Sequence, residues 1–264
     1  MAIEVKNLRF CYGGRPVIGD VSFTAEKGEL LAVLGPNGVG KSTLFRCLLG
    51  FLEPVSGEIL AEGKPLSGYS RRELARKIAY IPQSHTPAFD HTVLDSVLMG
   101  MTAQLGVFEQ PGGLQREKAM QMLRALGLEK LADRGCMKIS GGERQLMLLA
   151  RALVQDASML IMDEPTANLD YGNSCRVMER VQQLGRQGYT IIFSTHDPNQ
   201  AFSYATKVLA LKDGGVMASG APRDVLTEAV LSQLYGIPVA RCEVQTKLGT
   251  KTICMPMPGG EEDN

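Results

Sequence analysis

The chain has 264 residues, of which 44% are hydrophobic and 21% are charged, as in an ordinary globular protein. Lys and Arg balance Asp and Glu, 28 against 28, so no overall positive charge favours nucleic acid as a partner. The six cysteines form no CxxC or zinc spacing, and no apolar run approaches the ~20 residues that span a bilayer. We therefore expect reduced thiols, no secretory signal at the start, and no membrane span.

The first informative stretch is a glycine-rich loop between an expected strand, Glu29–Leu34, and an expected helix, Ser42–Leu49. The loop fits the pattern GxxxxGK[ST], in which backbone N–H groups and a helix N-terminus surround a phosphate. In this pattern Lys41 reaches the β- and γ-phosphates and Ser42 binds Mg²⁺. The alternative is a chance glycine turn. The expected ATP-binding residues of the loop are Gly35, Pro36, Asn37, Gly38, Val39, Gly40, Lys41, Ser42 and Thr43.

Two further apolar runs end in residues that carry chemistry. Ser158–Asp163 predicts a buried strand that ends in an acid, and Glu164 follows it directly. A buried strand does not tolerate an unpaired carboxylate, so we expect Asp163 at the carboxyl end of the strand, where α/β sheets bind ligands. Thr190–Thr195 predicts another buried strand, and His196 follows it. The alternatives are acids that cap a helix and a solvated histidine.

The middle of the chain, from about 88 to 155, changes to a helical pattern over Val93–Met101, Leu114–Leu126 and Arg144–Val154. Ser140 can cap the last of these helices, and Glu143 complements its positive end. Glycines 141 and 142 at the start of a helix also make an anion site like that of the phosphate loop. The alternative is simply a capped helix.

The stretch Ile139–Gln145, together with the phosphate loop ahead of it, resembles the signature of ABC-type ATPases. The resemblance covers about Ile3 to Pro256, with mild departures from the usual residues at Ile139 and Glu143. It implies an α/β fold: a P-loop NTPase (RecA-like) core with an antiparallel β subdomain and an inserted helical subdomain. The ATPase domain would span 1–240, with the core in 1–87 and 156–240 and the helical insert in 88–155. Residues 241–264 would be a C-terminal extension that ends in disorder.

The resemblance also implies roles for individual residues. The catalytic set is Glu164 as general base, His196 as the switch histidine at the γ-phosphate, and Gln83 of the Q-loop. The Mg²⁺ ligands are Ser42, Gln83 and Asp163, and Asp170 belongs to the D-loop beside the nucleotide. Tyr12 would stack on adenine, although an ordinary strand aromatic is the alternative. The signature residues of one subunit would meet the γ-phosphate held by a second copy in a head-to-tail dimer that sandwiches two ATP molecules; they are Ser140, Gly141, Gly142 and Glu143.

Three stretches, Tyr69–Gln83, Val93–Gly100 and Leu234–Val239, resemble the ATPases of iron-chelate, haem, cobalamin and molybdate importers. The implied function is the ATP-hydrolysing motor of a bacterial or archaeal importer, peripheral on the cytoplasmic face of the inner membrane. Its partners would be a multi-span permease and, indirectly, a substrate-binding protein, with no nucleic acid. Iron–siderophore is the favoured cargo, with haem, cobalamin or molybdate/tungstate as alternatives. The second alternative is a soluble ABC ATPase of the iron–sulfur assembly type, without a permease.

Two surface features have open interpretations. Phe89 lies among polar neighbours just after Gln83, so it is either an anchor for a permease helix or packs beneath its own loop. The basic run Arg71–Lys77 is either a solvated helix face, which we favour, or a patch that contacts lipid.

Overall fold

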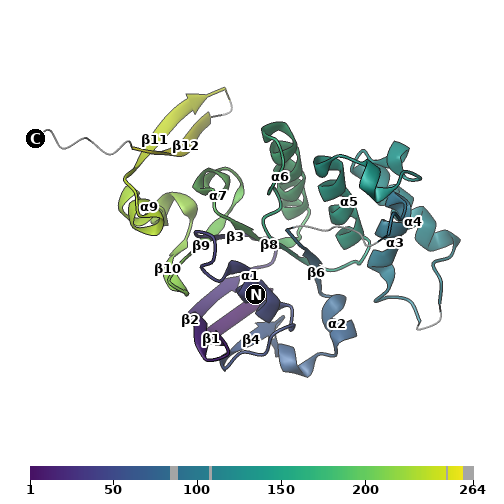
Figure 1. Ribbon diagram of the computed structural model, residues 1–264, viewed down its shortest axis with the longest axis horizontal. Helices are drawn as coiled ribbons and strands as arrows, with labels where there is room; N and C mark the ends of the chain where they lie inside the picture. The colour runs from purple at the N-terminus through teal and green to yellow at the C-terminus, as the bar shows by residue number, and fades with distance from the viewer. Residues whose placement is uncertain (84–88, 107–108, 248, 258–264) are drawn as a thin grey trace, which may run out of the picture. The chain divides into compact units, whose positions relative to one another are not determined.

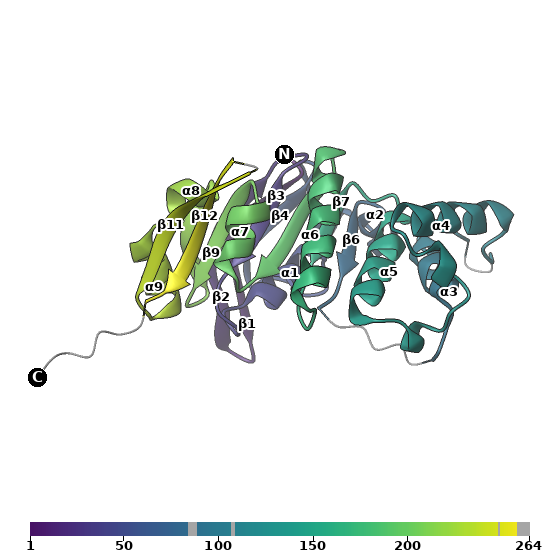
Figure 2. The same cartoon turned by 90° about the horizontal axis from the view of Figure 1, so that it is seen from above.

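The computed structural model describes residues 1–83, 89–106, 109–247 and 249–257, and it divides into two compact units. Met1–Leu66 and the chain from Ile192 onward form the first unit, and Ser67–Ile191 forms the second. Figure 1 and Figure 2 label their elements. The two units are defined by compactness alone. They do not test the functional boundaries predicted at 87/88, 155/156 and 240/241, which stay a prediction. The expected disorder at Pro258–Asn264 lies outside the described residues.

The first unit contains an antiparallel sheet with the strand order β2-β1-β4-β5. In β1, Ile3, Val5, Leu8 and Phe10 are buried while several of their neighbours face solvent, as expected for a sheet with one covered face. Ile3 pairs with Ala25 on one side and Ala61 on the other. The strands are β1 (Ile3–Tyr12), β2 (Arg15–Ala25), β4 (Ser56–Ala61) and β5 (Lys64–Pro65).

A second sheet positions the phosphate loop, and in the first unit its strand order is β10-β9-β3-β8. All five residues of β3 are buried, and β3 runs parallel to β9, as an apolar central strand of an α/β sheet should. The unit ends in an antiparallel hairpin of β11 and β12. The remaining elements of this unit are β3 (Leu30–Leu34), α1 (Lys41–Leu48), β8 (Thr190–Thr195), α7 (Pro198–Tyr204), β9 (Lys207–Lys212), β10 (Gly215–Gly220), α8 (Pro222–Val225), α9 (Glu228–Tyr235), β11 (Val239–Thr246) and β12 (Gly249–Pro256).

The second unit pairs two parallel strands and carries most of the helices. Ile78 to Ile81 of β6 align with Met159 to Met162 of β7. A short 3₁₀ turn follows α3 at Met99–Met101, and another follows α4 at Glu129–Leu131. A third lies just before the signature, at Cys136–Lys138. The elements are α2 (Arg71–Ala75), β6 (Ile78–Ile81), α3 (Val93–Leu98), α4 (Gly113–Ala125), α5 (Gly141–Leu153), β7 (Met159–Met162) and α6 (Tyr171–Arg186).

The strands and helices expected from the sequence are confirmed, with ends that move by a few residues. The run Thr190–Thr195 is β8 without any change. The helix expected from Arg144 begins three residues earlier, because Ser140 caps it and the two glycines form its first turn. Among the helices of the described residues, none is both long and apolar enough to cross a membrane.

Candidate nucleotide site

The phosphate loop leaves the carboxyl end of β3 and enters α1 within seven residues. Gly35 N donates to Thr195 O at 3.3 Å, which ties the start of the loop to the end of β8. Gly38 and Gly40 have φ angles of 83° and 109°, a region that residues with a Cβ rarely adopt. A Cβ on Gly40 would also lie 2.9 Å from Ile18 Cδ1. The glycines are therefore required by the path of the loop.

Lys41 is the first residue of α1, and its side chain is buried, with 5% of the residue exposed. Its ammonium donates to Gly35 O at 2.6 Å and to Pro36 O at 3.2 Å. A buried ammonium needs such partners, because its desolvation is costly. The loop thus holds a fixed positive charge at the N-terminus of a helix, and both features attract a phosphate.

A pocket of ≈830 Å³ opens beside the loop within the first unit. Tyr12, the last residue of β1, is 43% exposed on its wall and meets Phe10 edge to face at 4.8 Å between ring centroids. Sequence reasoning missed the far wall, which comes from the β9–β10 turn and the end of α9. The lining residues include Tyr12, Arg15, Asn37, Gly38, Lys212, Asp213, Gly214, Gln233, Tyr235 and Gly236. A pocket of this size is typical of a nucleotide-sized ligand.

His196 directly follows β8 and is exposed. Asp197 N donates to Thr195 Oγ1 at 3.0 Å, and Asp197 Oδ1 accepts from Asn199 N at 2.8 Å, which starts α7. The Tyr235 hydroxyl donates to His196 O at 3.0 Å. The backbone around His196 is therefore fixed on both sides, while its ring lies at the surface.

In the second unit, Gln83 and Glu164 lie at the carboxyl ends of neighbouring parallel strands, β6 and β7. Gln83 Nε2 donates to Glu164 Oε2 at 3.2 Å. Asp163 is 4% exposed, and its backbone N–H donates to Ile81 O at 2.9 Å. Glu164 has a φ of 43°, unusual for a residue with a side chain and a conformation that clusters at functional sites. The two predicted catalytic side chains of this unit are thus in contact.

The signature and the D-loop both form helix caps. Ser140 Oγ accepts from Glu143 N at 3.3 Å, and Glu143 Oε2 accepts from Ser140 N at 2.7 Å, a complete capping box. Asp170 caps α6 by accepting from the backbone N–H of Asn173 at 2.8 Å and from its side chain at 2.7 Å. The hydrogen bond from the Asn173 backbone N–H stabilises the charged carboxylate and is the main reason why the pKa of Asp170 is lowered. The capping interpretation of Ser140 is confirmed, and the cap takes up the Glu143 N–H, one of the N–H groups that the start of a helix leaves without a partner within the helix.

The structure brings the predicted residues together in two sets. The loop, Tyr12 and His196 belong to the first unit, whereas Gln83, Asp163, Glu164, the signature and Asp170 belong to the second. Within the described residues, no cluster of three or more His, Cys, Asp or Glu side chains could hold a metal ion. Mg²⁺ needs no such cage, because it binds through one or two carboxylates together with waters and substrate phosphates. The Asp163 carboxylate fits that pattern, and the Ser42 hydroxyl and the Gln83 amide supply oxygens, the ligand type that Mg²⁺ takes.

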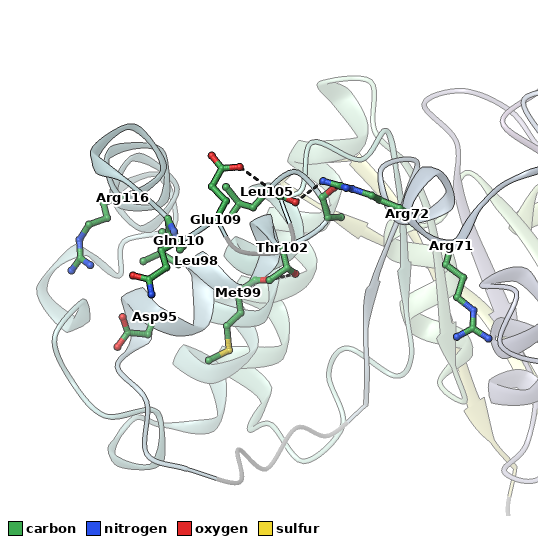
Figure 3. A pocket seen from close by; sticks show the side chains of 13 residues that line it. Arg71, Arg72, Asp95, Leu98, Met99, Thr102, Leu105, Glu109, Gln110 and Arg116 are labelled. Atoms are coloured by element: carbon green, nitrogen blue, oxygen red, sulfur yellow. Dashed lines mark hydrogen bonds between the residues drawn. The ribbon is translucent and has the colours of Figure 1, made fainter.

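A second pocket, of ≈820 Å³, lies in the second unit and contains none of the predicted nucleotide residues. Figure 3 shows Arg72 reaching the loop that follows α3, where its guanidinium donates to Leu105 O and, at 2.9 Å, to Ala103 O. Arg76 donates to the same Ala103 carbonyl at 3.2 Å. Arg72 and Arg76 remain exposed while they bind these backbone carbonyls, so the Arg71–Lys77 stretch is a solvent-facing surface that also contacts the neighbouring loop.

The first unit has a glycine loop with a buried lysine between a strand and a helix, and the second has paired polar residues at the ends of parallel strands. These features define a P-loop nucleotide-binding α/β protein. Comparison with known families narrows this class. The model of the ABC transporter family matches residues 18–167. The chain belongs to this family and is an ATP-binding, ATP-hydrolysing subunit of an ABC transporter. The predicted P-loop fold and the ATPase activity are confirmed. ATP-binding subunits of this family work with membrane permease components.

Individual relatives align along nearly the whole chain. A probable iron chelatin transport ATP-binding protein of Helicobacter pylori is 38% identical over 90% of this chain and 94% of its own. The molybdate import ATP-binding protein MolC of Haemophilus influenzae is 36% identical over 97% of this chain and 96% of its own. A solved structure of a proposed metal-chelate type ABC transporter, in an inward-facing conformation, is 36% identical, with a TM-score of 0.88 and 97% of each chain covered. The predicted likeness to these importers is confirmed.

Proposed function

We propose that this ATPase drives the import of a metal chelate into a bacterial or archaeal cell, and we favour an iron–siderophore as cargo. The observation that carries the proposal is the likeness to an iron chelatin transport protein and to a metal-chelate type transporter along at least 90% of the chain. The molybdate relative keeps molybdate or tungstate among the alternatives, with haem and cobalamin. The cargo would not contact the ATPase, so the alternative cargoes would be distinguished by the permease and not by this chain.

The hydrolytic step that we propose uses the two sets of residues described above. The loop binds the phosphates, Lys41 bonds to the β- and γ-phosphates, and Tyr12 stacks on the base. Glu164 orients water and accepts one of its protons as the water oxygen bonds to the γ-phosphorus and the bond to the bridging oxygen of ADP breaks. Its contact with Gln83 supports this role, because a hydrogen-bonded carboxylate has a defined direction. His196 contacts the γ-phosphate.

Mg²⁺ belongs to this proposal, and Ser42, Gln83 and Asp163 would hold it. A bound Mg²⁺ neutralises charge on the β- and γ-phosphates. The burial of Asp163 supports its part, because a buried carboxylate is usually retained for a charged partner.

The active form in our proposal is a head-to-tail dimer of two copies. The start of α5 is supported as an anion site by its two glycines at a helix N-terminus, and the second copy would supply the phosphate. Such a contact is isologous, so each dimer holds two ATP molecules between a phosphate loop and a partner's signature. ATP then favours the closed dimer by binding it more tightly than the open one.

The dimer would sit at the cytoplasmic face of the inner membrane, bound to a multi-span permease that receives cargo from a substrate-binding protein. Phe89 supports a docking surface, because it is 73% exposed in the segment that follows Gln83. Its ring meets that of His91 edge to face, at 6.0 Å between ring centroids, and its exposure favours the anchor over a ring packed beneath its own loop. An exposed aromatic of this kind is a candidate anchor for a permease helix.

Uptake by cells tests the proposal. A strain that lacks this chain would be given radiolabelled ferric siderophore, haem, cobalamin or molybdate, and complemented with the wild-type chain or with Lys41→Ala. We expect the wild-type chain, but not the variant, to restore uptake of ferric siderophore. Restored uptake of only one of the other substrates would identify that substrate as the cargo in place of ferric siderophore. Normal uptake of all four without the chain, with the protein recovered in soluble complexes, would favour the iron–sulfur assembly type.

A further inference from the structure

Three hydrogen bonds tie the segment that carries His196 to α9 and β12, and they use the side chains of two residues, Tyr235 and Asn199. The Tyr235 hydroxyl at the end of α9 donates to His196 O at 3.0 Å. Asn199 Nδ2 donates to Cys254 O at 3.1 Å, and Cys254 N donates to Asn199 Oδ1 at 2.8 Å. The Asn199 amide thus pairs with β12 as a neighbouring strand would. Figures 1 and 2 both show α7 beside the hairpin of β11 and β12.

The same face of α7 makes a second contact with the hairpin. Phe202 lies three residues after Asn199, so the two side chains share one side of the helix. The Arg241 guanidinium of β11 lies 6.0 Å from the Phe202 ring centroid, within range of a cation–π interaction. Arg241 also donates to Arg223 O at 2.7 Å from its side chain and to Glu228 Oε1 at 2.6 Å from its backbone. The hairpin is therefore bound to α8 and α9 as well as to α7.

The path from the hairpin to His196 is short and packed. Asn199 uses its side chain on Cys254 and its backbone N–H on Asp197, the residue after His196. Burial, and after it the Asp197 carboxylate, raises the pKa of the Cys254 thiol to about 11, which agrees with a closely packed joint in which the thiol is uncharged. Nothing in this joint belongs to the phosphate loop. Residues 239–256 also lie outside the stretch that the ABC transporter model matches.

We propose that α9 and the C-terminal hairpin position His196 for hydrolysis: Asn199 holds the start of α7 against β12, and Tyr235 of α9 holds the His196 carbonyl. This inference rests on the proposed role of His196 at the γ-phosphate. A side chain points where the backbone that carries it directs it, so the contacts that fix the backbone on both sides of His196 limit the directions that its ring can take. A misplacement of about 1 Å can reduce a rate on the order of 100-fold. Asn199 and Tyr235 are positioning residues, not catalytic ones.

Steady-state ATPase kinetics of the full chain test the proposal, with rates expressed per ATP-binding site titrated by calorimetry. Asn199→Ala removes both bonds to Cys254, and we expect kcat to fall on the order of tenfold with an unchanged KM for ATP. Asn199→Asp keeps the acceptor and loses the donor, so its kcat should be intermediate. Tyr235→Phe removes one hydrogen bond and keeps the ring, which provides a milder variant if Asn199→Ala folds poorly. Thr250→Ala is the matched control, because it removes a bond within the hairpin, to Gln245 at 3.2 Å, and should keep the wild-type kcat.

A double variant separates positioning from general stability. If Asn199 acts through His196, then Asn199→Ala should leave the residual rate of His196→Ala unchanged. A fall by the same factor as in the wild type would overturn the positioning role. Wild-type kcat in both Asn199→Ala and Tyr235→Phe, together with a strong loss in His196→Ala, would overturn it while leaving the proposed function intact. A wild-type kcat in His196→Ala would instead refute the role of His196 itself, and the hairpin's role with it.

Discussion

The side-chain amide of Asn173 lies directly against the backbone of Gly142, so that a Cβ on Gly142 would fall 2.6 Å from Asn173 Cγ. Asn173 is in the first turn of α6, where it bonds to Asp170, which caps that helix, and accepts from the Arg176 guanidinium at 3.4 Å. The second glycine of the signature therefore has a packing function within its own subunit. It allows the D-loop and the signature helix to approach closely, independently of any contact with ATP.

Gly142→Ala is therefore expected to destabilise the protein even without nucleotide. Overpacking of this kind costs about 1–3 kcal/mol, which lowers the melting temperature by several degrees in a chain of this size. Asn173→Ala in the same chain should recover most of the loss, because it removes the atoms that clash. Gly141→Ala is the control: its Cβ would meet only the end of the Leu169 side chain, at 3.2 Å, so a smaller shift is expected. Equal shifts for both glycines, or no recovery in the double variant, would contradict the packing role.

Glu164→Gln should bind ATP normally and lose turnover. The amide oxygen can still accept from Gln83, so the contact is kept, while the group can no longer accept a proton. Removal of a general base costs about 10²–10⁴-fold in rate, and unhydrolysed ATP should then trap the dimer in size-exclusion chromatography. Glu73→Gln is the control, since Glu73 caps α2 by accepting from Ser70 N at 2.7 Å and is not one of the predicted nucleotide residues. Wild-type turnover in Glu164→Gln would refute the assignment.

Local patterns were sufficient to predict the elements that carry the nucleotide motifs, because these depend on short-range signals. The apolar run before Gly35, the glycines of the loop and the Ser140–Glu143 capping box each specify their own geometry. Contacts between distant residues could not be read in this way. Asn173 against Gly142, and Asn199 against Cys254, depend on which helix faces which strand, and a lone asparagine carries no signal of that. The bonds of Arg72 and Arg76 could not be predicted for the same reason, since the carbonyls that they bind lie about 30 residues away in the sequence.

Lys41→Ala should weaken ATP binding itself. The ammonium already lies in the loop, 2.6 Å from Gly35 O, so it needs little reorganisation to reach a phosphate. Loss of a charge-assisted contact costs on the order of 1.5–3 kcal/mol, about 10- to 150-fold in Kd by isothermal titration calorimetry. Because the substitution also removes bonds within the loop, the melting temperature must be measured alongside. The exposed Lys27→Ala serves as control and should bind normally; an unchanged Kd for Lys41→Ala would show that ATP does not bind at the loop.

Mixed dimers test whether hydrolysis needs two chains. A Ser140→Arg subunit has an intact loop and a blocked signature, whereas a Lys41→Ala subunit has the reverse. Each parent dimer has two defective sites, while the mixed dimer has one complete site, so part of the ATPase activity should return on mixing. Differently tagged subunits, purified in tandem, ensure that only mixed dimers are assayed. Failure to recover any activity in purified mixed dimers would argue against a signature that acts on the partner's ATP, or would mean that both sites must act together.

Phe89→Ala should separate ATP chemistry from transport. Phe89 is 73% exposed, so its removal should leave the melting temperature and ATP affinity unchanged. If its ring anchors a permease helix, the loss should weaken the complex on the order of 2 kcal/mol or more, as expected for an aromatic at the centre of an interface. Co-purification with the permease and cellular uptake should both fall. Phe51→Ala is the matched control, since Phe51 is a similarly exposed ring, at 67%, outside the segment after Gln83. Wild-type uptake and permease yield in Phe89→Ala, or equal losses in both variants, would exclude Phe89 as the anchor.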